Sequence, residues 1–293
     1  MISDVQTSIV LHGGFGNQLF QWAFGHHAAS KGLKVDFVFY NKTNLVEHTR
    51  EPLQKLLQGC AHGRFRVEEL SKFKFIRILQ DPTHPKSPFQ FKANRICNTL
   101  ALPFTAPSLD SPKRYYFGYY QNSTLVHDLE NILIRELEFS LNLEPISPIE
   151  KELIGAEVIH IRQGDTMTPT NLQRVGVLDS EYYARMPSKS SKTRVVVTDD
   201  VKGATLMFNG HQIDAFLGPE DLDVRRSLGV MSRSSLLFTA NSTLSWWGGV
   251  LALNRGANVF IPDPFFRNVQ PPPGRTFQYP GFQTVESSFL DLY

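Results

Sequence analysis

Short apolar segments that suit buried strands alternate along the chain with segments of helical periodicity, and this alternation constrains the fold more than any other feature. Near the start, an apolar run at residues 8–11 is followed by a helical pattern at 17–30 and a second apolar run at 35–40. In the second half the alternation restarts with apolar runs at 157–161 and 194–198. Strands separated by helices are typically parallel strands joined by crossovers. The sequence therefore predicts an α/β fold.

The remaining elements follow from the same pattern, with less regularity. Strands are expected at residues 115–120, 236–239 and 259–261, and helices at 127–139, 222–233 and 245–254, with another that contains 182–184. Further short elements are expected at 206–208 and 211–216. Residues 80–115, rich in proline and serine, are expected to form an irregular excursion with a short helix at 91–100.

A seam divides the two halves at LNLEPISP, residues 141–148, where Pro145 and Pro148 interrupt a polar stretch. We therefore expect an N-terminal domain at residues 1–148 and a C-terminal domain at 149–293. Two α/β halves joined in this way imply a cleft between them, where a ligand would bind.

Composition excludes several classes of protein. Lys and Arg exceed Asp and Glu by only 30 to 28, which argues against a general nucleic-acid binder. Cys60 and Cys97 lack metal-ligand spacing and are expected to be reduced thiols rather than a disulfide. Neither a secretory signal pattern nor an apolar run of about 18 residues is present. We expect a cytoplasmic protein, for which attachment to the inner face of a membrane stays open.

The segment GGFGNQLFQWAFG, from Gly13 to Gly25, lies between the first expected strand and helix. Its glycines match neither the dinucleotide pattern GxGxxG nor a P-loop. Two interpretations stay open: a tight structural turn, or a turn whose backbone approaches a phosphate at the helix N-terminus.

Polar residues follow three expected strands of the second half. His160 and Arg162 are two residues apart, so both lie on one face of their strand, and the Arg162 fork suits a phosphate. A surface ion pair between Arg162 and Asp165 is the alternative.

The second and third strand ends carry VTDD at residues 197–200 and Asn241-Ser242-Thr243. Asp199 and Asp200 could bind a base edge or a sugar hydroxyl, although for Asp200 capping of the next helix is favoured. The segment 241–243 starts a helix and could bind an anion, or Ser242 or Ser245 could be an ordinary N-cap.

Two features suggest other functions. Asp221-Leu222-Asp223 has the Asp-x-Asp form that binds manganese in many glycosyltransferases, but its place at a helix start favours dipole compensation. Trp246 and Trp247 could stack on a glycan in a non-catalytic sugar-binding protein, but core packing is the favoured interpretation.

With these segments identified, the chain resembles the inverting α-1,2-fucosyltransferase family, which uses GDP-fucose. The matching segments, in the family's order, are GGFGNQLFQWAFG (13–25), FGYYQN (117–122), HIRQGD (160–165), VLDSEYY (177–183), VTDD (197–200) and NSTLSWWGG (241–249). The resemblance implies a GT-B fold, with two Rossmann-like domains facing across a cleft. It also implies metal-independent transfer to the 2-hydroxyl of a terminal galactoside, on an oligosaccharide or glycolipid, with no cofactor.

The resemblance also implies roles for individual residues. Arg162 would hold the pyrophosphate as a catalytic residue, and Asn17 would line the cleft opposite it, with Gly14 and Gly16 beside the donor. In the second half, His160 and one of Asp199 or Asp200 would face the guanosine, and Ser242 and Thr243 would donate to the phosphates. Asp199, Asp200 and Asn241 are all expected among the donor-binding residues.

The chain departs from the family pattern at two positions. Gln163 and Thr166 stand where the family often has arginine and tyrosine, which puts in doubt any role of those two side chains. The general base is not evident, and His12, Asp36 and Glu47 are candidates only by residue type.

Overall fold

The computed structural model describes residues 6–11, 13–40, 64–68, 109, 115–116, 118–143, 145–208, 212–269 and 277–291. Contacts divide the chain into two compact units, Met1–Leu133 and Ile134–Tyr293. The division falls inside a helix, so it does not mark a linker. The domain boundary expected at residue 148 stays a prediction.

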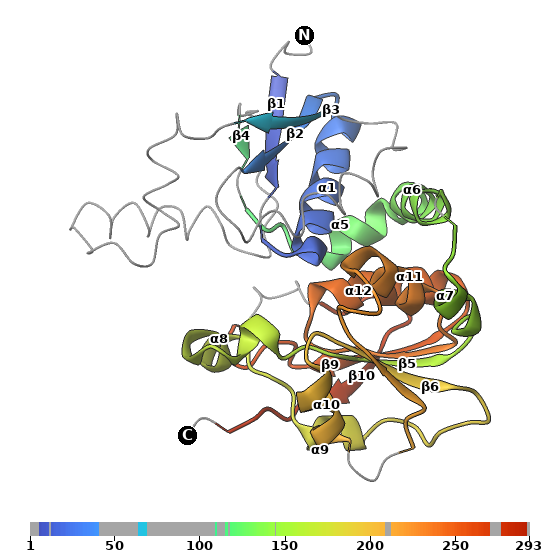
Figure 1. Ribbon diagram of the computed structural model, residues 1–293. Helices are drawn as coiled ribbons and strands as arrows, with labels where there is room; N and C mark the ends of the chain where they lie inside the picture. Colours follow the sequence, from blue (N-terminus) through green and yellow to red (C-terminus); the bar gives the residue numbers. More distant parts are fainter. Residues whose placement is uncertain are drawn as a thin grey trace. The chain divides into compact units, whose positions relative to one another are not determined.

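The N-terminal unit contains a parallel sheet in the order β3-β2-β1-β4, shown in Figure 1. Its strands are β1 (Gln6–Leu11), β2 (Lys34–Tyr40), β3 (Arg64–Glu68) and β4 (Tyr115–Tyr116). Helix α1 (Phe15–Ser30) connects β1 to β2 as a crossover. Gly25 lets α1 approach the sheet closely, because a Cβ there would lie 2.4 Å from the ring of Phe37 on β2.

Several expectations for this unit need correction. The strand expected at 115–120 is only two residues long, and Tyr120 has φ +52° and stacks on Phe24 with ring centroids 4.1 Å apart. The helix expected at 127–139 is two helices, α5 (Ser123–Asp128) and α6 (Glu130–Asn142), separated by Leu129. The expectations for residues 80–108, Cys60 and Cys97 lie outside the described residues.

The C-terminal unit contains six parallel strands in the order β10-β9-β8-β5-β6-β7. They are β5 (Glu157–Ile161), β6 (Arg194–Thr198), β7 (Ala215–Leu217), β8 (Leu236–Phe238), β9 (Asn258–Asp263) and β10 (Gln283–Glu286). Counted from β5 in chain order, this is the 3-2-1-4-5-6 order of a Rossmann sheet, whose connections change direction between β5 and β8. The predicted α/β class is confirmed, with a parallel sheet in each unit.

Helices cover both faces of this sheet (Figure 1). Val158 belongs to the apolar cluster formed with α11 (Val224–Ser232) and α12 (Thr243–Asn254). Its neighbour Ile159 belongs to the opposite cluster, formed with α9 (Ser180–Ala184) and α10 (Val201–Met207). The strands are therefore buried on both sides, as their continuous apolar sequences require.

Some short elements were not expected. They are α7 (Pro148–Glu152), the 3₁₀ helix η2 (Gly164–Met167), α8 (Pro169–Arg174), β3 and β10. Residues 206–208 are not a separate element, because α10 extends to Met207. In the part of the chain that the structure describes, no helix combines the length and apolar character needed to cross a bilayer.

Candidate functional site

The carboxyl ends of β5 and β8 form the switch point of the C-terminal sheet, the position where ligands bind in open parallel sheets. The register pairs Ile159 of β5 with Phe238 of β8, so His160 and Thr239 come next on neighbouring strands. Arg162 follows the end of β5, and α12 begins a few residues beyond the end of β8. Most of the predicted donor-binding residues of this unit thus come together at one edge of the sheet.

Arg162 forms an ion pair with Asp199, which follows the neighbouring strand β6. The distance from Nη1 of Arg162 to Oδ2 of Asp199 is 2.9 Å, and the two side chains are 35% and 21% exposed. The alternative pair with Asp165 concerns a side chain that the structure does not describe. The Arg162 side chain is therefore partly exposed and has a defined carboxylate partner.

The carboxylate of Asp200 and the amide of Asn241, both expected to bind the donor, have hydrogen-bond partners within the protein. Asp200 is the N-cap of α10, where its side chain accepts a 3.0 Å hydrogen bond from the backbone N–H of Gly203, as the capping interpretation predicts. Asn241 is buried, and its amide donates to the carbonyl oxygens of Val175 and Gly176 at 3.2 and 3.0 Å. Their contacts with a donor stay predictions.

The start of α12 suits an anion. Ser242 is the N-cap, accepting a 3.3 Å hydrogen bond from the backbone N–H of Leu244, while Ser245 is buried and donates to the carbonyls of Ala240 and Ser242. Thr243 is the first helical residue and, like Ser242, is partly exposed. A twelve-residue helix presents backbone N–H groups and the positive end of its dipole at this point.

His160 is almost completely buried, and burial followed by the charge of Arg162 lowers its pKa to about 3. The imidazole is therefore neutral at physiological pH. Its Nδ1 has no hydrogen-bond partner, nor does Oγ1 of the fully buried Thr239. Unpaired buried polar atoms are rare and point to an ordered water or a ligand. Sequence reasoning missed Thr239, because a single threonine at a strand end carries no distinguishing signal.

The two departures from the family pattern have structural partners. Gln163 is buried against the start of α10, where a Cβ on Gly203 would lie 2.5 Å from its Oε1. Thr166 donates its hydroxyl to the carbonyl oxygen of Gln163. Thr166 therefore helps to hold the loop that carries Arg162, whereas Oε1 of the Gln163 side chain is buried without a hydrogen-bond partner.

The glycine turn of the N-terminal unit is exposed at Gly13 and Gly14. Gly13 has φ +76°, which favours glycine, and Gly14 is the extended N-cap of α1 with open space around a Cβ. Gly16 is buried within α1. Asn17 is held by Gln121, whose Nε2 donates to its Oδ1 at 2.7 Å. The facing of Asn17 and Arg162 across a cleft stays a prediction.

The structure does not identify a general base among the three candidates, His12, Asp36 and Glu47. His12 and Glu47 lie outside the described residues. Asp36 is buried and is the third residue of β2, toward the amino end of the strand rather than the carboxyl edge where ligands bind.

The features behind the alternative functions are used in the fold. Asp223 caps α11 by accepting from the backbone N–H of Arg226 at 2.8 Å, and Asp221 accepts from that of Gly218 at 2.9 Å. Trp246 and Trp247 are fully buried, and Nε1 of Trp246 donates to the carbonyl of Phe277. Core packing of both tryptophans is confirmed. Within the described ranges, no group of three or more His, Cys, Asp or Glu side chains suited to a metal ion is found.

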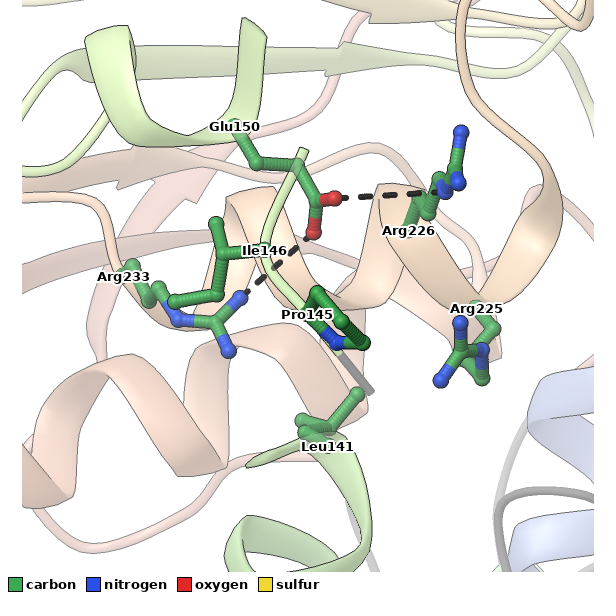
Figure 2. Close-up of a pocket in the computed structure, with 7 residues that line it drawn as sticks. All are labelled: Leu141, Pro145, Ile146, Glu150, Arg225, Arg226 and Arg233. Atoms are coloured by element: carbon green, nitrogen blue, oxygen red, sulfur yellow. Dashed lines mark ion pairs between the residues drawn. The ribbon is translucent and has the colours of Figure 1, made fainter. Parts of the chain in front are cut away.

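A cluster of arginines surrounds Glu150 of α7, which sequence reasoning did not identify. Figure 2 shows Glu150 between Arg233 and Arg226. Its carboxylate lies 3.7 Å from Arg233 and 3.9 Å from Arg226, and Arg225 and Arg226 are neighbours on helix α11. The hollow among them has a volume of about 10 Å³, enough for about one water. We interpret the cluster as a set of ion pairs that holds α7 against α11. The signal that could have revealed α7 is Ser147 with Glu150, which form a capping box.

The chain is similar to two curated glycosyltransferases of Escherichia coli. It is 25% identical over 288 residues to the O-antigen biosynthesis glycosyltransferase WbnK, covering 87% of this chain and 93% of that protein. It is 23% identical over 282 residues to an α-1,2-colitosyltransferase, covering 87% of this chain and 91% of that protein. No family model matches the chain.

Solved structures with a similar chain path include two glycosyltransferases. The E. coli heptosyltransferase WaaC with ADP has a TM-score of 0.47 at 10% identity, covering 96% of this chain and 93% of that one. The NodZ α-1,6-fucosyltransferase soaked with GDP-fucose has a TM-score of 0.46 at 12% identity, covering 85% of this chain and 93% of that one.

Proposed function

We propose that the chain is a glycosyltransferase that transfers L-fucose from GDP-fucose to the 2-hydroxyl of a terminal galactoside, with inversion at the anomeric carbon. Similarity to two glycosyltransferases over 87% of the chain supports the general activity. The motifs from GGFGNQLF to NSTLSWWGG support the fucosyltransferase assignment. The acceptor would be a galactose-terminated oligosaccharide or glycolipid, reached in the cytoplasm or at the inner face of the membrane.

The observation that carries the proposal is the position of Arg162 at the switch point, near the start of α12. In the proposed reaction the acceptor oxygen attacks the anomeric carbon, and the bond from that carbon to the phosphate oxygen breaks. The electron pair leaves with GDP, while the hydroxyl proton passes to a base not yet identified. Arg162 and the α12 N-terminus stabilise the negative charge that develops on the diphosphate.

The proposal includes independence from metal ions and from any cofactor. In metal-dependent glycosyltransferases a divalent cation neutralises the leaving diphosphate, whereas here Arg162 supplies a cation at the same kind of position. The side chains of Asp221 and Asp223, the alternative ligands, each accept a hydrogen bond from a backbone N–H group.

A second donor is favoured by one specific finding. One relative is named an α-1,2-colitosyltransferase, which supports the 1,2 linkage but raises colitose as the transferred sugar. A transfer assay in which GDP-fucose and GDP-colitose compete for the same acceptor distinguishes these two donors.

The first test is calorimetric titration of GDP, with UDP as the control, into purified protein that contains EDTA. We expect GDP to bind and UDP to bind much more weakly. Equal affinity for both nucleotides, or binding only after manganese is added, would contradict the proposed donor site. Transfer from GDP-fucose to a panel of β-galactosides, with the linkage read by NMR, then tests the acceptor and the position of attachment.

A further inference from the structure

We propose that Asp199 is a positioning residue that holds Arg162 and its loop in place, rather than a direct contact of the nucleoside. This inference rests on the proposed function, because it assigns how the diphosphate-binding arginine is oriented. The family resemblance implies that one of Asp199 or Asp200 faces the guanosine, and this inference assigns Asp199 another role.

The two carboxylate oxygens of Asp199 both contact the loop after β5. Oδ2 lies 2.9 Å from Nη1 of Arg162, and Oδ1 accepts a 2.8 Å hydrogen bond from the backbone N–H of Gln163. The register that pairs Ile161 with Thr198 brings the residues following β5 and β6 next to each other. One side chain thus fixes both the guanidinium and the backbone that carries it.

Gly164 completes the arrangement. A Cβ at this position would lie 2.4 Å from Oδ2 of Asp199, closer than real Cβ atoms approach. The loop therefore passes against the carboxylate so closely that only glycine fits without moving it. Because Asp is a short side chain, such a displacement would also break its contact with Arg162.

The partial exposure of the Arg162–Asp199 ion pair indicates that its main effect is on the orientation of Arg162 rather than on stability. Ion pairs that are partly exposed to solvent contribute little to stability. An arginine side chain has many rotamers, however, and fixing them when a diphosphate binds costs free energy. Asp199 orders the guanidinium before the ligand arrives, which favours both binding and stabilisation of the transition state.

The test compares Asp199→Asn, Arg162→Ala and the double variant by calorimetry with GDP and UDP and by steady-state transfer from GDP-fucose. Asparagine keeps an acceptor for Gln163 but loses the charge that pairs with Arg162. We expect Asp199→Asn to weaken GDP binding and turnover by about ten- to a hundredfold, the range for a lost charge-assisted hydrogen bond. The preference for GDP over UDP should remain.

The double-variant comparison separates positioning from direct contact. If Asp199 acts through Arg162, the double variant should be no weaker than Arg162→Ala alone. Effects that multiply, or loss of the preference for GDP in Asp199→Asn, would overturn the inference and favour contact with the base.

Asp214 offers a matched control at the opposite end of β6. Its carboxylate also pairs with a cation, Lys189, and also accepts a backbone N–H, from Arg194 at 2.8 Å. Asp214→Asn should leave GDP binding unchanged. An equal loss in this variant would show a general effect of removing such carboxylates and overturn the inference.

A measurement without ligand separates this inference from the proposed function. Hydrogen exchange of the Gln163 amide should be faster in Asp199→Ala than in the wild type, and unaltered in Asp214→Ala. If the wild-type protein fails to bind GDP but hydrogen exchange behaves as expected, the proposed function is wrong, while the role of Asp199 in holding the loop is supported. Unchanged exchange of the Gln163 amide in Asp199→Ala would overturn the inference that Asp199 holds the loop.

Discussion

Arg162 is the residue on which the proposed chemistry depends, because its cation lies at the carboxyl edge of the central strand β5. Its position could be predicted from the sequence, since a strand that ends in His-x-Arg delivers the arginine to that edge. Its partner could not. Asp199 lies 36 residues beyond Gln163, and only the order of β5 and β6 in the sheet brings it to Arg162.

Replacement of Arg162 by alanine should remove most turnover while leaving the fold intact. Loss of one such charge contact costs about 10²–10³ in rate, and the side chain is partly exposed, so stability should change little. Transfer from GDP-fucose measures the rate and thermal unfolding measures the fold. Arg162→Lys keeps the charge but loses the planar fork, so its turnover should lie between that of the wild type and that of Arg162→Ala. Near-normal turnover in Arg162→Ala would remove this residue from the mechanism.

His160 should make the stability of the protein depend on pH. Its pKa is about 3 when folded, against 6.5 as the ordinary value, so between these values only the unfolded chain binds the proton. The contribution to stability is fully present above pH 6.5 and is lost as the pH falls toward 3. At pH 5 the loss is about 2 kcal/mol.

Urea unfolding of wild type and His160→Gln at pH 7.5 and pH 5 measures this effect. Glutamine does not titrate, so the variant should lose about 2 kcal/mol less than the wild type over this range. Parallel losses in the two proteins would mean that His160 is protonated in the folded state near its ordinary pKa.

At the scale of elements, burial decides what the sequence can predict. Strands β5 and β6 begin and end where expected, because each is five consecutive buried residues. Strands β3 and β10 were missed, since RFRVE and QTVE are polar at alternate or most positions. Residues 141–148 were read as a seam because of Pro145 and Pro148, and helix α7 was missed, although Pro148 in its first turn is compatible with a helix start.

The contact between α1 and β2 should make Gly25→Ala destabilising. Alanine usually stabilises a helix relative to glycine by about 1 kcal/mol. Here its Cβ would meet the buried Phe37 ring at 2.4 Å, and overpacking of this kind costs about 1–3 kcal/mol. Chemical denaturation should therefore show a net loss of stability.

Phe37→Leu tests the cause of that loss. With the ring removed, Gly25→Ala should cost less than it does in the wild-type background, so the two effects should not add. A stabilising effect of Gly25→Ala in the wild type would show that the helix and strand separate to accommodate the methyl group.

At the scale of the whole molecule, the sequence predicted two α/β halves but not the strand order of either sheet. Order depends on which strand each crossover returns to, and local patterns do not record it. The Rossmann order of the C-terminal unit is what places the ends of β5, β6 and β8 at one edge. The predicted site residues from these strands therefore gain a common location only when the sheet is known.

The whole enzyme should work without a divalent ion. Asp223 caps α11, and Asp221 accepts a hydrogen bond from the backbone N–H of Gly218. Asp221→Ala/Asp223→Ala should therefore lower stability by about 1 kcal/mol for the lost cap and by about 1 kcal/mol for the lost hydrogen bond. Turnover at saturating GDP-fucose should change little in that variant. Wild-type turnover should be the same in EDTA as in manganese, because in the proposed mechanism Arg162 and the α12 N-terminus neutralise the leaving diphosphate. Initial rates in both solutions, with denaturation curves for the variant, test both statements. A rate that falls in EDTA, returns with manganese and is abolished in the double variant would instead assign the diphosphate to a metal ion held by Asp221 and Asp223.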